Sequence, residues 1–271
     1  MDLIVANDDG VEDYGIWILA QELQQIGRVA LYSPERNCSG AGMSISLRKK
    51  FDLRSVSGPA DFDVDIPAFA VEAPPATVVA LGALHAYDGQ ADAVVAGINS
   101  GWNPGIEAYK VSGTVGAARV AVERGILGIA ISAATELQPF KQHVDGMKAY
   151  RSIASATRRM LDAVQDVFNP LPNVLVNVNV PANYSAETPV RLTRPGPFTL
   201  FSGLVMCDRC DGDDAATVRI EYGDYFSAGA TSENEIGALA NGSVAISVTG
   251  AAPAEVLLHD PWPSIAEAFR P

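Results

Sequence analysis

Two adjacent carboxylates stand directly after the first apolar run of the chain. Residues 3–6 (LIVA) lead into the four residues Asn7-Asp8-Asp9-Gly10. Neighbouring carboxylates repel each other and lose solvation at the edge of a core, so a cation between them would stabilise both. Mg²⁺, Mn²⁺ and Ca²⁺ prefer oxygen ligands of this kind. The pair predicts a hard-cation site; the alternative is that one aspartate caps the next helix while the other is solvated.

Two later loops add neutral oxygen donors. Residues 36–46 (RNCSGAGMSIS) follow a second apolar run and carry the Ser39 hydroxyl beside Gly40, where the bare backbone lets a ligand approach closely. Residues 97–105 (GINSGWNPG) place Asn99 at the end of another apolar run, and its amide oxygen can bind a cation without adding charge. Taken singly, each loop also fits an ordinary flexible turn.

A third feature is suited to phosphate rather than to metal. Ser112-Gly113-Thr114 stands at the start of a predicted helix, and the free N–H groups of a helix N-terminus favour an anion. The alternative for Ser112 is N-capping alone. Because ligands of an open α/β sheet bind beyond the carboxyl ends of its strands, we expect the loops and this helix end to converge there.

The elements that must position these loops alternate between strand and helix. Short apolar runs predict buried strands, and helical spacing with caps and stops predicts the helices between them. The strands are expected at residues 3–6, 29–32, 93–96, 126–132 and 173–180, and the helices at 16–23, 76–85, 112–124 and 143–167. Strand, helix, strand at the start of the chain is a βαβ unit, which implies a parallel sheet with right-handed crossovers.

This alternation stops near residue 183, where Pro, Gly and Asp become frequent. We expect an α/β fold, with a Rossmann-like, doubly wound, mostly parallel catalytic domain over residues 1–183 and a smaller, mostly β elaboration over residues 184–271. Apolar and polar residues alternate over residues 47–72, which predicts a hairpin or edge strands. In the C-terminal part, strands are expected at 217–222 and 243–248 and a helix at 264–269. That part offers no large core of its own, so we expect it to dock on another subunit and to serve oligomerisation.

Composition narrows the classes of partner. The chain has 271 residues and a formal net charge of −13, and an acidic surface opposes binding to DNA or RNA polymers. No apolar run approaches the ~18 residues that span a bilayer, and the N-terminus lacks a signal-peptide pattern. We therefore expect a cytoplasmic protein that binds neither nucleic-acid polymers nor membranes. A small phosphorylated substrate is compatible with this charge, because a bound metal supplies positive charge locally.

The three cysteines, Cys38, Cys207 and Cys210, do not describe a disulfide framework. The last two have CxxC spacing, but a zinc site needs about two further ligands, and a redox CxxC belongs to a βαβ context. Residues 203–214 instead predict an irregular loop. We interpret the pair as two loop thiols.

Four motifs occur in order within residues 1–135: LIVANDDG, RNCSGAGMSIS, VVAGINSGWNPG and SGTVGAA. Together with ALANGSVAISVT at residues 238–249, they resemble the SurE family (survival protein E), metal-dependent 5′/3′-nucleotidases that act on nucleoside monophosphates. The resemblance implies a Rossmann-type domain and a C-terminal part exchanged between the subunits of a homodimer or homotetramer. It also implies one divalent cation per subunit, Mg²⁺ or Mn²⁺, with Ca²⁺ as an alternative in a crystal.

The resemblance assigns roles to individual residues. Its metal ligands match Asp8, Asp9, Ser39 and Asn99. Of these, the catalytic residues would be Asp8, Asp9 and Asn99. Its phosphate pocket matches Asn103, Ser112, Gly113 and Thr114, to which we add Asn7 and Gly40 from the first two loops.

The chain departs from the family pattern next to these positions, since Val111 stands for a tyrosine and Val120 for an acidic residue. We expect phosphatase chemistry, on nucleoside monophosphates first. The alternatives are a phosphatase for another small phosphorylated metabolite in a specialised biosynthetic pathway, and a non-catalytic module that binds metal or nucleotide. Trp102, Tyr109 or Phe201 could stack on a base; equally, each could pack in the core or at a subunit contact.

Overall fold

The computed structural model describes residues 1–60, 62, 64–134, 144–197, 201–209, 216–222, 229–250 and 259–270. Its strands are β1 Asp2–Ala6, β2 Arg28–Pro34, β3 Arg54–Ser55, β4 Ala68–Val71, β5 Ala93–Ser100, β6 Leu127–Ala133, β7 Leu175–Val180, β8 Val190–Thr193, β9 Phe201–Arg209, β10 Ala216–Tyr222 and β11 Val244–Thr249. Its helices are α1 Tyr14–Leu23, α2 Pro75–His85, the short 3₁₀ helix η1 Ala86–Gly89, α3 Gly105–Val111, α4 Gly113–Val122, α5 Val144–Val167, α6 Glu235–Ala240 and α7 Trp262–Glu267.

The main sheet has the strand order β3-β4-β2-β1-β5-β6-β7-β11-β8. The strands from β4 to β7 run parallel, β11 runs antiparallel to β7, and β8 runs parallel to β11. β2 and then β4 lie on one side of β1, whereas β5, which comes later in the chain, pairs with β1 on the other side. The strand order therefore reverses between β1 and β5, and ligands of open α/β sheets bind beyond the carboxyl ends of the strands at such a reversal.

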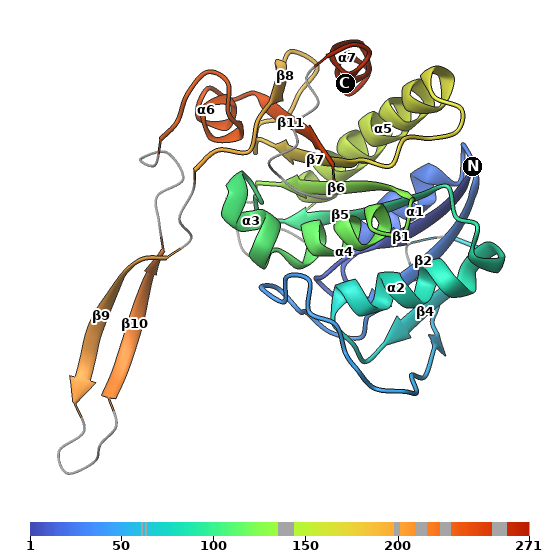
Figure 1. Cartoon of the computed structure of the whole chain (residues 1–271), viewed down its shortest axis with the longest axis horizontal. Helices are drawn as coiled ribbons and strands as arrows, with labels where there is room; N and C mark the ends of the chain where they lie inside the picture. The colour runs from blue at the N-terminus through green and yellow to red at the C-terminus, as the bar shows by residue number, and fades with distance from the viewer. Residues whose placement is uncertain are drawn as a thin grey trace.

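Helices cover both faces of this sheet (Figure 1). α2 and α4 pack on one face, over a core that includes Val78 and Val115. α1, α5 and α7 pack on the other face, over a core that includes Ile16, Leu161 and Ile265. Because both faces are covered, central strands such as β6 and β7 are buried along their whole length, which explains why β6 is mostly apolar and why both faces of β7 are buried although it carries Asn177 and Asn179.

The structure confirms the α/β fold with a mostly parallel, doubly wound sheet, and the first βαβ unit is β1, α1 and β2. β3 and β4 pair antiparallel at one edge, within the segment expected to supply edge strands. The interpretation of residues 203–214 as an irregular loop is wrong for its first half. Residues 203–209 belong to β9, which pairs antiparallel with β10, while residues 210–214, with Cys210, lie outside the described residues.

The C-terminal part contributes to two sheets. β8 and β11 follow residue 183 in the chain but extend the main sheet beyond β7, whereas β9 and β10 form a separate two-stranded sheet. In Figure 1 this β9–β10 hairpin projects away from the body of the molecule. The sheet thus continues across the expected boundary at residue 183, and the division into two domains stays a prediction.

None of the helices in the described stretches combines the length and the apolar composition needed to cross a membrane. The cytoplasmic location stays a prediction.

Candidate active site

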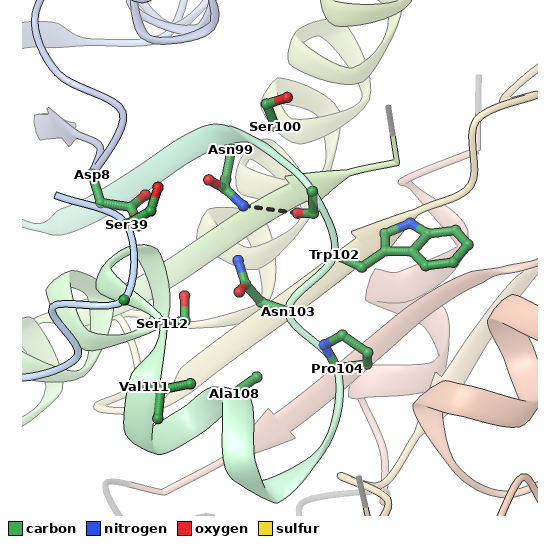
Figure 2. Close-up of a pocket in the computed structure, with 12 residues that line it drawn as sticks. Asp8, Ser39, Asn99, Ser100, Trp102, Asn103, Pro104, Ala108, Val111 and Ser112 are labelled. Carbon is green, nitrogen blue, oxygen red and sulfur yellow. Dashed lines mark hydrogen bonds between the residues drawn. The ribbon is translucent and has the colours of Figure 1, made fainter. Parts of the chain in front are cut away.

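A cavity of about 210 Å³ is lined by residues that follow β1 and end β5, where the strand order reverses. Figure 2 shows the side chains around it. They come from the loops after β1 and β2, from the end of β5 and the loop that follows it, from α3, and from the start of α4. The lining residues are Asp8, Ser39, Gly40, Asn99, Ser100, Gly101, Trp102, Asn103, Pro104, Ala108, Val111 and Ser112. Three separate loops that the sequence singled out therefore meet at one cavity.

Asp8 lies just beyond β1, and only 3% of it is exposed. Thr114, in the first turn of α4, donates a hydrogen bond from Oγ1 to Asp8 Oδ1 at 2.6 Å. Burial and the neighbouring charge of Asp9 raise the pKa of Asp8 to about 6, although the Thr114 hydroxyl acts in the opposite direction. The N-cap of α1 is Asp13, so neither aspartate of the pair has the capping role that was the alternative to a cation site.

Asp9 is held by donors from two other loops. Asn37 donates from Nδ2 to Asp9 Oδ1 at 2.9 Å, and the N–H of Ser100 donates to Oδ2 at 3.2 Å. The amide oxygen of Asn37 also accepts the N–H of Ser39 at 2.9 Å. Asn37 therefore connects Asp9 to the loop that carries Ser39 into the cavity wall.

The Asn99 side chain is oriented by its own hydrogen bond. Its Nδ2 donates to the carbonyl oxygen of Gly101 at 2.8 Å, and its Oδ1 consequently faces Asp8 and Ser39 (Figure 2). Asn99 is 7% exposed and pairs with Ser132 across β5 and β6. The end of β5 thus presents a neutral oxygen donor towards the buried carboxylate.

The first turn of α4 packs directly behind Asp8. Ser112 accepts the N–H of Val115 at 3.1 Å and is the N-cap of this helix, as the sequence predicted, and it also lines the cavity. Gly113 lets the start of α4 lie this close to Asp8, because a Cβ at position 113 would lie 2.6 Å from the Cβ of Asp8. Gly113 and Thr114 are not lining residues, so they act on the site through Asp8.

Asn7 is not among the residues that line the cavity. Its amide donates to the carbonyl oxygen of Gly10 at 2.9 Å and accepts the hydroxyl of Ser33 at 2.8 Å. These contacts hold the turn that carries the two aspartates. The geometry gives Asn7 a structural role there and does not support its expected contact with phosphate.

The candidate aromatic residues occupy different surroundings. Trp102 lines the cavity, and its indole N–H donates to the carbonyl oxygen of Val180 at 2.7 Å. Tyr109 is fully buried, so it packs in the core and cannot stack on a base. The side chain of Phe201 lies outside the described residues.

Polar side chains that the sequence did not single out hold the loop from Asn103 to Gly105. Asn179 Oδ1 accepts the N–H of Asn103 at 2.7 Å, and Asn177 Nδ2 donates to the Asn103 carbonyl at 3.0 Å. Glu235 accepts the N–H of Gly105 through Oε2, and Nδ2 of Asn177 through Oε1 at 3.0 Å. The two asparagines at alternate positions of a buried strand could have been recognised from the sequence as candidates for a polar contact. Glu235 could not have been recognised, because it lies 130 residues from its partner Gly105.

The oxygen donors at the cavity suit a hard divalent cation. Asp8 supplies a carboxylate, and Ser39 and Asn99 supply neutral oxygens from separate loops. Asp9 is next to Asp8 in the chain but is not a lining residue, and its carboxylate accepts hydrogen bonds from Asn37 and from the Ser100 N–H. Among the described residues no three His, Cys, Asp or Glu side chains cluster as metal ligands, so a cation here would depend on the hydroxyl and amide oxygens as well. The raised pKa of the buried Asp8 fits this arrangement, because a cation would favour its charged form.

Comparison with known families agrees with this geometry. The family model described as Survival protein SurE matches residues 3–200, which include every loop around the cavity. The chain belongs to the SurE family. The match confirms the family resemblance found in the four motifs of residues 1–135, and it continues beyond those motifs through β8.

Curated SurE relatives match most of the chain. The 5′-nucleotidase SurE of Chloroflexus aggregans is 37% identical over 242 residues, covering 82% of this chain and 90% of that protein. The 5′-nucleotidase SurE of Methanoregula boonei is 31% identical over 236 residues, covering 80% and 88%. The crystal structure of the SurE protein from Aquifex aeolicus is similar with a TM-score of 0.71 and 25% identity, covering 95% of this chain and 94% of that one. The SurE fold therefore extends over nearly the whole chain, including its C-terminal part.

Proposed function

We propose that this member of the SurE family is a divalent-metal-dependent phosphomonoesterase that hydrolyses nucleoside 5′- and 3′-monophosphates to nucleoside and phosphate. The observation that carries the proposal is the meeting of Asp8, Ser39 and Asn99 at one cavity beside the start of α4. Relatives named 5′-nucleotidase SurE support the enzyme class, a hydrolase acting on phosphoric monoesters.

The proposed cofactor is one divalent cation per subunit, Mg²⁺ or Mn²⁺. The residues that would hold it are Asp8, Asp9, Ser39 and Asn99. When bound, such a cation neutralises phosphate oxygens and makes water a better nucleophile. Ca²⁺ accepts the same oxygen ligands and is an alternative occupant.

The chain itself would orient the phosphoryl group, since phosphoryl transfer depends mainly on positioning and charge stabilisation. Gly40 and Ser112 line the cavity next to the oxygen donors. The Ser112 oxygen accepts its capping bond and still has a hydroxyl proton to donate to a phosphate oxygen. A carboxylate of the Asp8-Asp9 pair would act as general base or as nucleophile.

Removal of either carboxylate tests the assignment. Asp8→Asn and Asp9→Ala should lower Mn²⁺-dependent phosphate release by about 100-fold or more, because even outer-shell changes at metal sites cost about 10–100-fold. Asp52→Asn, at an exposed aspartate, is the matched control and should keep wild-type activity. Near-full Mn²⁺-dependent release by Asp9→Ala would contradict the proposed ligand set.

A substrate panel separates this proposal from its alternatives. Nucleoside monophosphates should be hydrolysed faster than sugar phosphates, with Mg²⁺ or Mn²⁺ and not with EDTA. The second candidate is a phosphatase for another small phosphorylated metabolite. It is supported by Val111, which lines the cavity where the family pattern has a tyrosine. If the protein binds metal or nucleotide but hydrolyses none of these substrates, nor p-nitrophenyl phosphate, then the remaining interpretation is a non-catalytic binding module.

We also propose that a second copy of the chain binds the C-terminal part, giving a homodimer or homotetramer. The β9–β10 hairpin projects from the body, and a two-stranded sheet alone is marginally stable in water (Figure 1). Its strand edges offer hydrogen-bonding groups to a partner strand. A stable monomer in light scattering at micromolar concentration would remove this proposal.

A further inference from the structure

A buried carboxylate outside the proposed metal site holds one wall of the cavity. Glu235, in the first turn of α6, is 0% exposed. Both of its oxygens accept hydrogen bonds from amide groups, one from the Gly105 N–H and the other from Asn177 Nδ2. Burying a carboxylate is costly unless its acceptors are used, so the contacts at both oxygens matter.

These contacts lead directly to Asn103. The same Asn177 Nδ2 donates to the Asn103 carbonyl at 3.0 Å, and Asn179 accepts the Asn103 N–H at 2.7 Å. The Asn103 side chain donates from Nδ2 to Ser132 Oγ at 2.9 Å. Side chains of β7 and α6 thereby hold the backbone at Asn103, and Ser132 of β6 contacts its side-chain amide.

Asn103 is placed where a substrate group would lie. In Figure 2 its amide lies between Asn99 and Ser112, on the cavity side of the loop. A hydroxyl both donates and accepts, so the amide can turn its N–H₂ towards an anion and still accept a hydrogen bond from Ser132. Its reach towards the ligand depends on where the loop backbone is held.

We propose that Glu235 is a positioning residue that sets substrate affinity by fixing Asn103 at the cavity wall. The proposal rests on the phosphatase function above and gives Glu235 no contact with substrate or cation. Asn99 has anchors of its own, through Gly101 and through pairing with β6. If the loop from Asn103 to Gly105 is held less firmly, Asn99 should stay in place, so substrate binding should weaken more than cation binding.

Glu235→Gln keeps the side-chain shape and removes one acceptor. A glutamine has one amide oxygen, so it cannot accept from both the Gly105 N–H and Asn177 Nδ2. If the Asn177 amide turns over to accept from the new N–H₂ group, its own Nδ2 leaves the Asn103 carbonyl. In either case the loop loses one of its hydrogen bonds.

The test compares the steady-state kinetics of Glu235→Gln with those of Glu233→Gln. Glu233 is exposed on the same segment, so this control makes the same change of charge away from the cavity. For Glu235→Gln we expect KM for a nucleoside monophosphate to rise about tenfold with kcat within about threefold, the pattern of lost binding common to substrate and transition state. Mn²⁺ affinity should stay within about twofold of wild type, and the control should match wild type throughout.

A double-mutant cycle separates positioning from mere support of the fold. If Glu235 acts through Asn103, then Glu235→Gln should change KM by less than about twofold in an Asn103→Ala background. A purely structural role would lower the thermal midpoint and the active fraction in both backgrounds and leave KM unchanged. Wild-type KM for Glu235→Gln, or an undiminished effect in the Asn103→Ala background, would overturn the proposal.

Two further measurements keep the proposal testable. If Glu235→Gln does not fold, Asn179→Ala removes another contact to Asn103 and should raise KM in the same way; an unchanged KM would overturn the proposal. If the wild type hydrolyses no phosphate monoester, the proposed function fails, and calorimetry with inorganic phosphate and Mn²⁺ takes the place of kinetics. Binding about tenfold weaker in Glu235→Gln supports positioning, whereas equal binding, or none by either protein, overturns it.

Discussion

The hydroxyl of Thr114 favours the charged form of Asp8. It donates to the buried Oδ1 at 2.6 Å and opposes the effects of burial and of Asp9 on the Asp8 pKa. Thr114→Val keeps the branched shape but removes the donor, so the Asp8 pKa should rise further. Because cations bind the deprotonated ligand, we expect Mn²⁺ affinity in titration calorimetry to weaken about five- to tenfold at pH 7, with a larger loss at pH 6.

Thr157 provides the matched control for this variant. It is buried in α5, and its Oγ1 donates to the Ile153 carbonyl at 2.9 Å, far along the chain from the cavity loops. Thr157→Val should lower stability without changing Mn²⁺ affinity by more than about twofold. Equal Mn²⁺ affinity of Thr114→Val and wild type at both pH values would show that Thr114 does not tune Asp8.

Elements that carry their own signal were predictable from the sequence, whereas those that depend on distant partners were not. α1 has apolar residues at helical spacing, and β6 is a run of apolar and small residues in which Ser132 is the one polar side chain. α3 begins after Pro104 without a side-chain cap, and its first N–H is bonded by Glu235, so no local pattern marks it. β9 is defined by its register with β10, in which Gly203 pairs with Glu221. Its apolar residues 204–207 stand between Ser202-Gly203 and the charged pair Asp208-Arg209, so the local pattern that marks the strand is short.

The same distinction applies to the site. The meeting of Asp8, Ser39 and Asn99 followed from one rule, that loops at the carboxyl ends of neighbouring parallel strands lie together. The side chains that hold Asn103 could not be found in that way, because Glu235 reaches the loop from α6, in the C-terminal part. The roles of these residues in binding metal and phosphate stay predictions.

Helix α4 and the loop carrying Ser39 approach each other through two glycines. A Cβ at Gly116 would lie 2.4 Å from the carbonyl oxygen of Gly42, and Gly42 is tied to the Val111 carbonyl by a 3.0 Å hydrogen bond. Gly116→Ala should therefore displace this loop and Ser39 with it. We expect kcat/KM for phosphate release to fall about tenfold or more, since a shift of about 1 Å in a positioning element can cost about 100-fold.

Ala121→Gly is the control for this displacement. It changes a buried position of the same helix and costs about 1 kcal/mol in helix propensity, without adding an atom near the loop. Its kcat/KM should stay within about twofold of wild type although its thermal midpoint falls. If the Gly116→Ala enzyme kept wild-type kcat/KM, the glycine contact would not be what positions Ser39.

The charge of the whole molecule limits which phosphate compounds it can bind. With a net charge of −13, the surface repels polyanions, and a local cation at the cavity would be needed to attract one phosphate group. We expect no binding of a single-stranded oligonucleotide in fluorescence anisotropy at micromolar protein and 150 mM salt, roughly physiological ionic strength. Tight, salt-sensitive oligonucleotide binding would contradict this prediction, because it would require a local cluster of basic residues despite the negative net charge.

Glu235 also links the stability of the whole molecule to pH. Burial raises its pKa from 4.5 to about 7, so the folded chain holds this proton more tightly than the unfolded chain. The resulting stability is fully present below about pH 4.5 and is lost as the pH rises through about 7. Tyr109, which lies beside Glu235, stays neutral over this range because burial raises its pKa well above the usual value.

Urea unfolding in EDTA at pH 5 and pH 8 measures this linkage. Between the two pH values, the free energy of unfolding of the wild type should fall relative to Glu235→Gln by about 1–3 kcal/mol. Asp8 also titrates with a raised pKa, but it is present in both proteins and cancels in the difference. Glu233→Gln should follow the wild type, because Glu233 is exposed. Parallel pH profiles of wild type and Glu235→Gln would mean that Glu235 titrates alike in the folded and unfolded chain, and that the hydrogen bonds from Gly105 and Asn177 offset its burial.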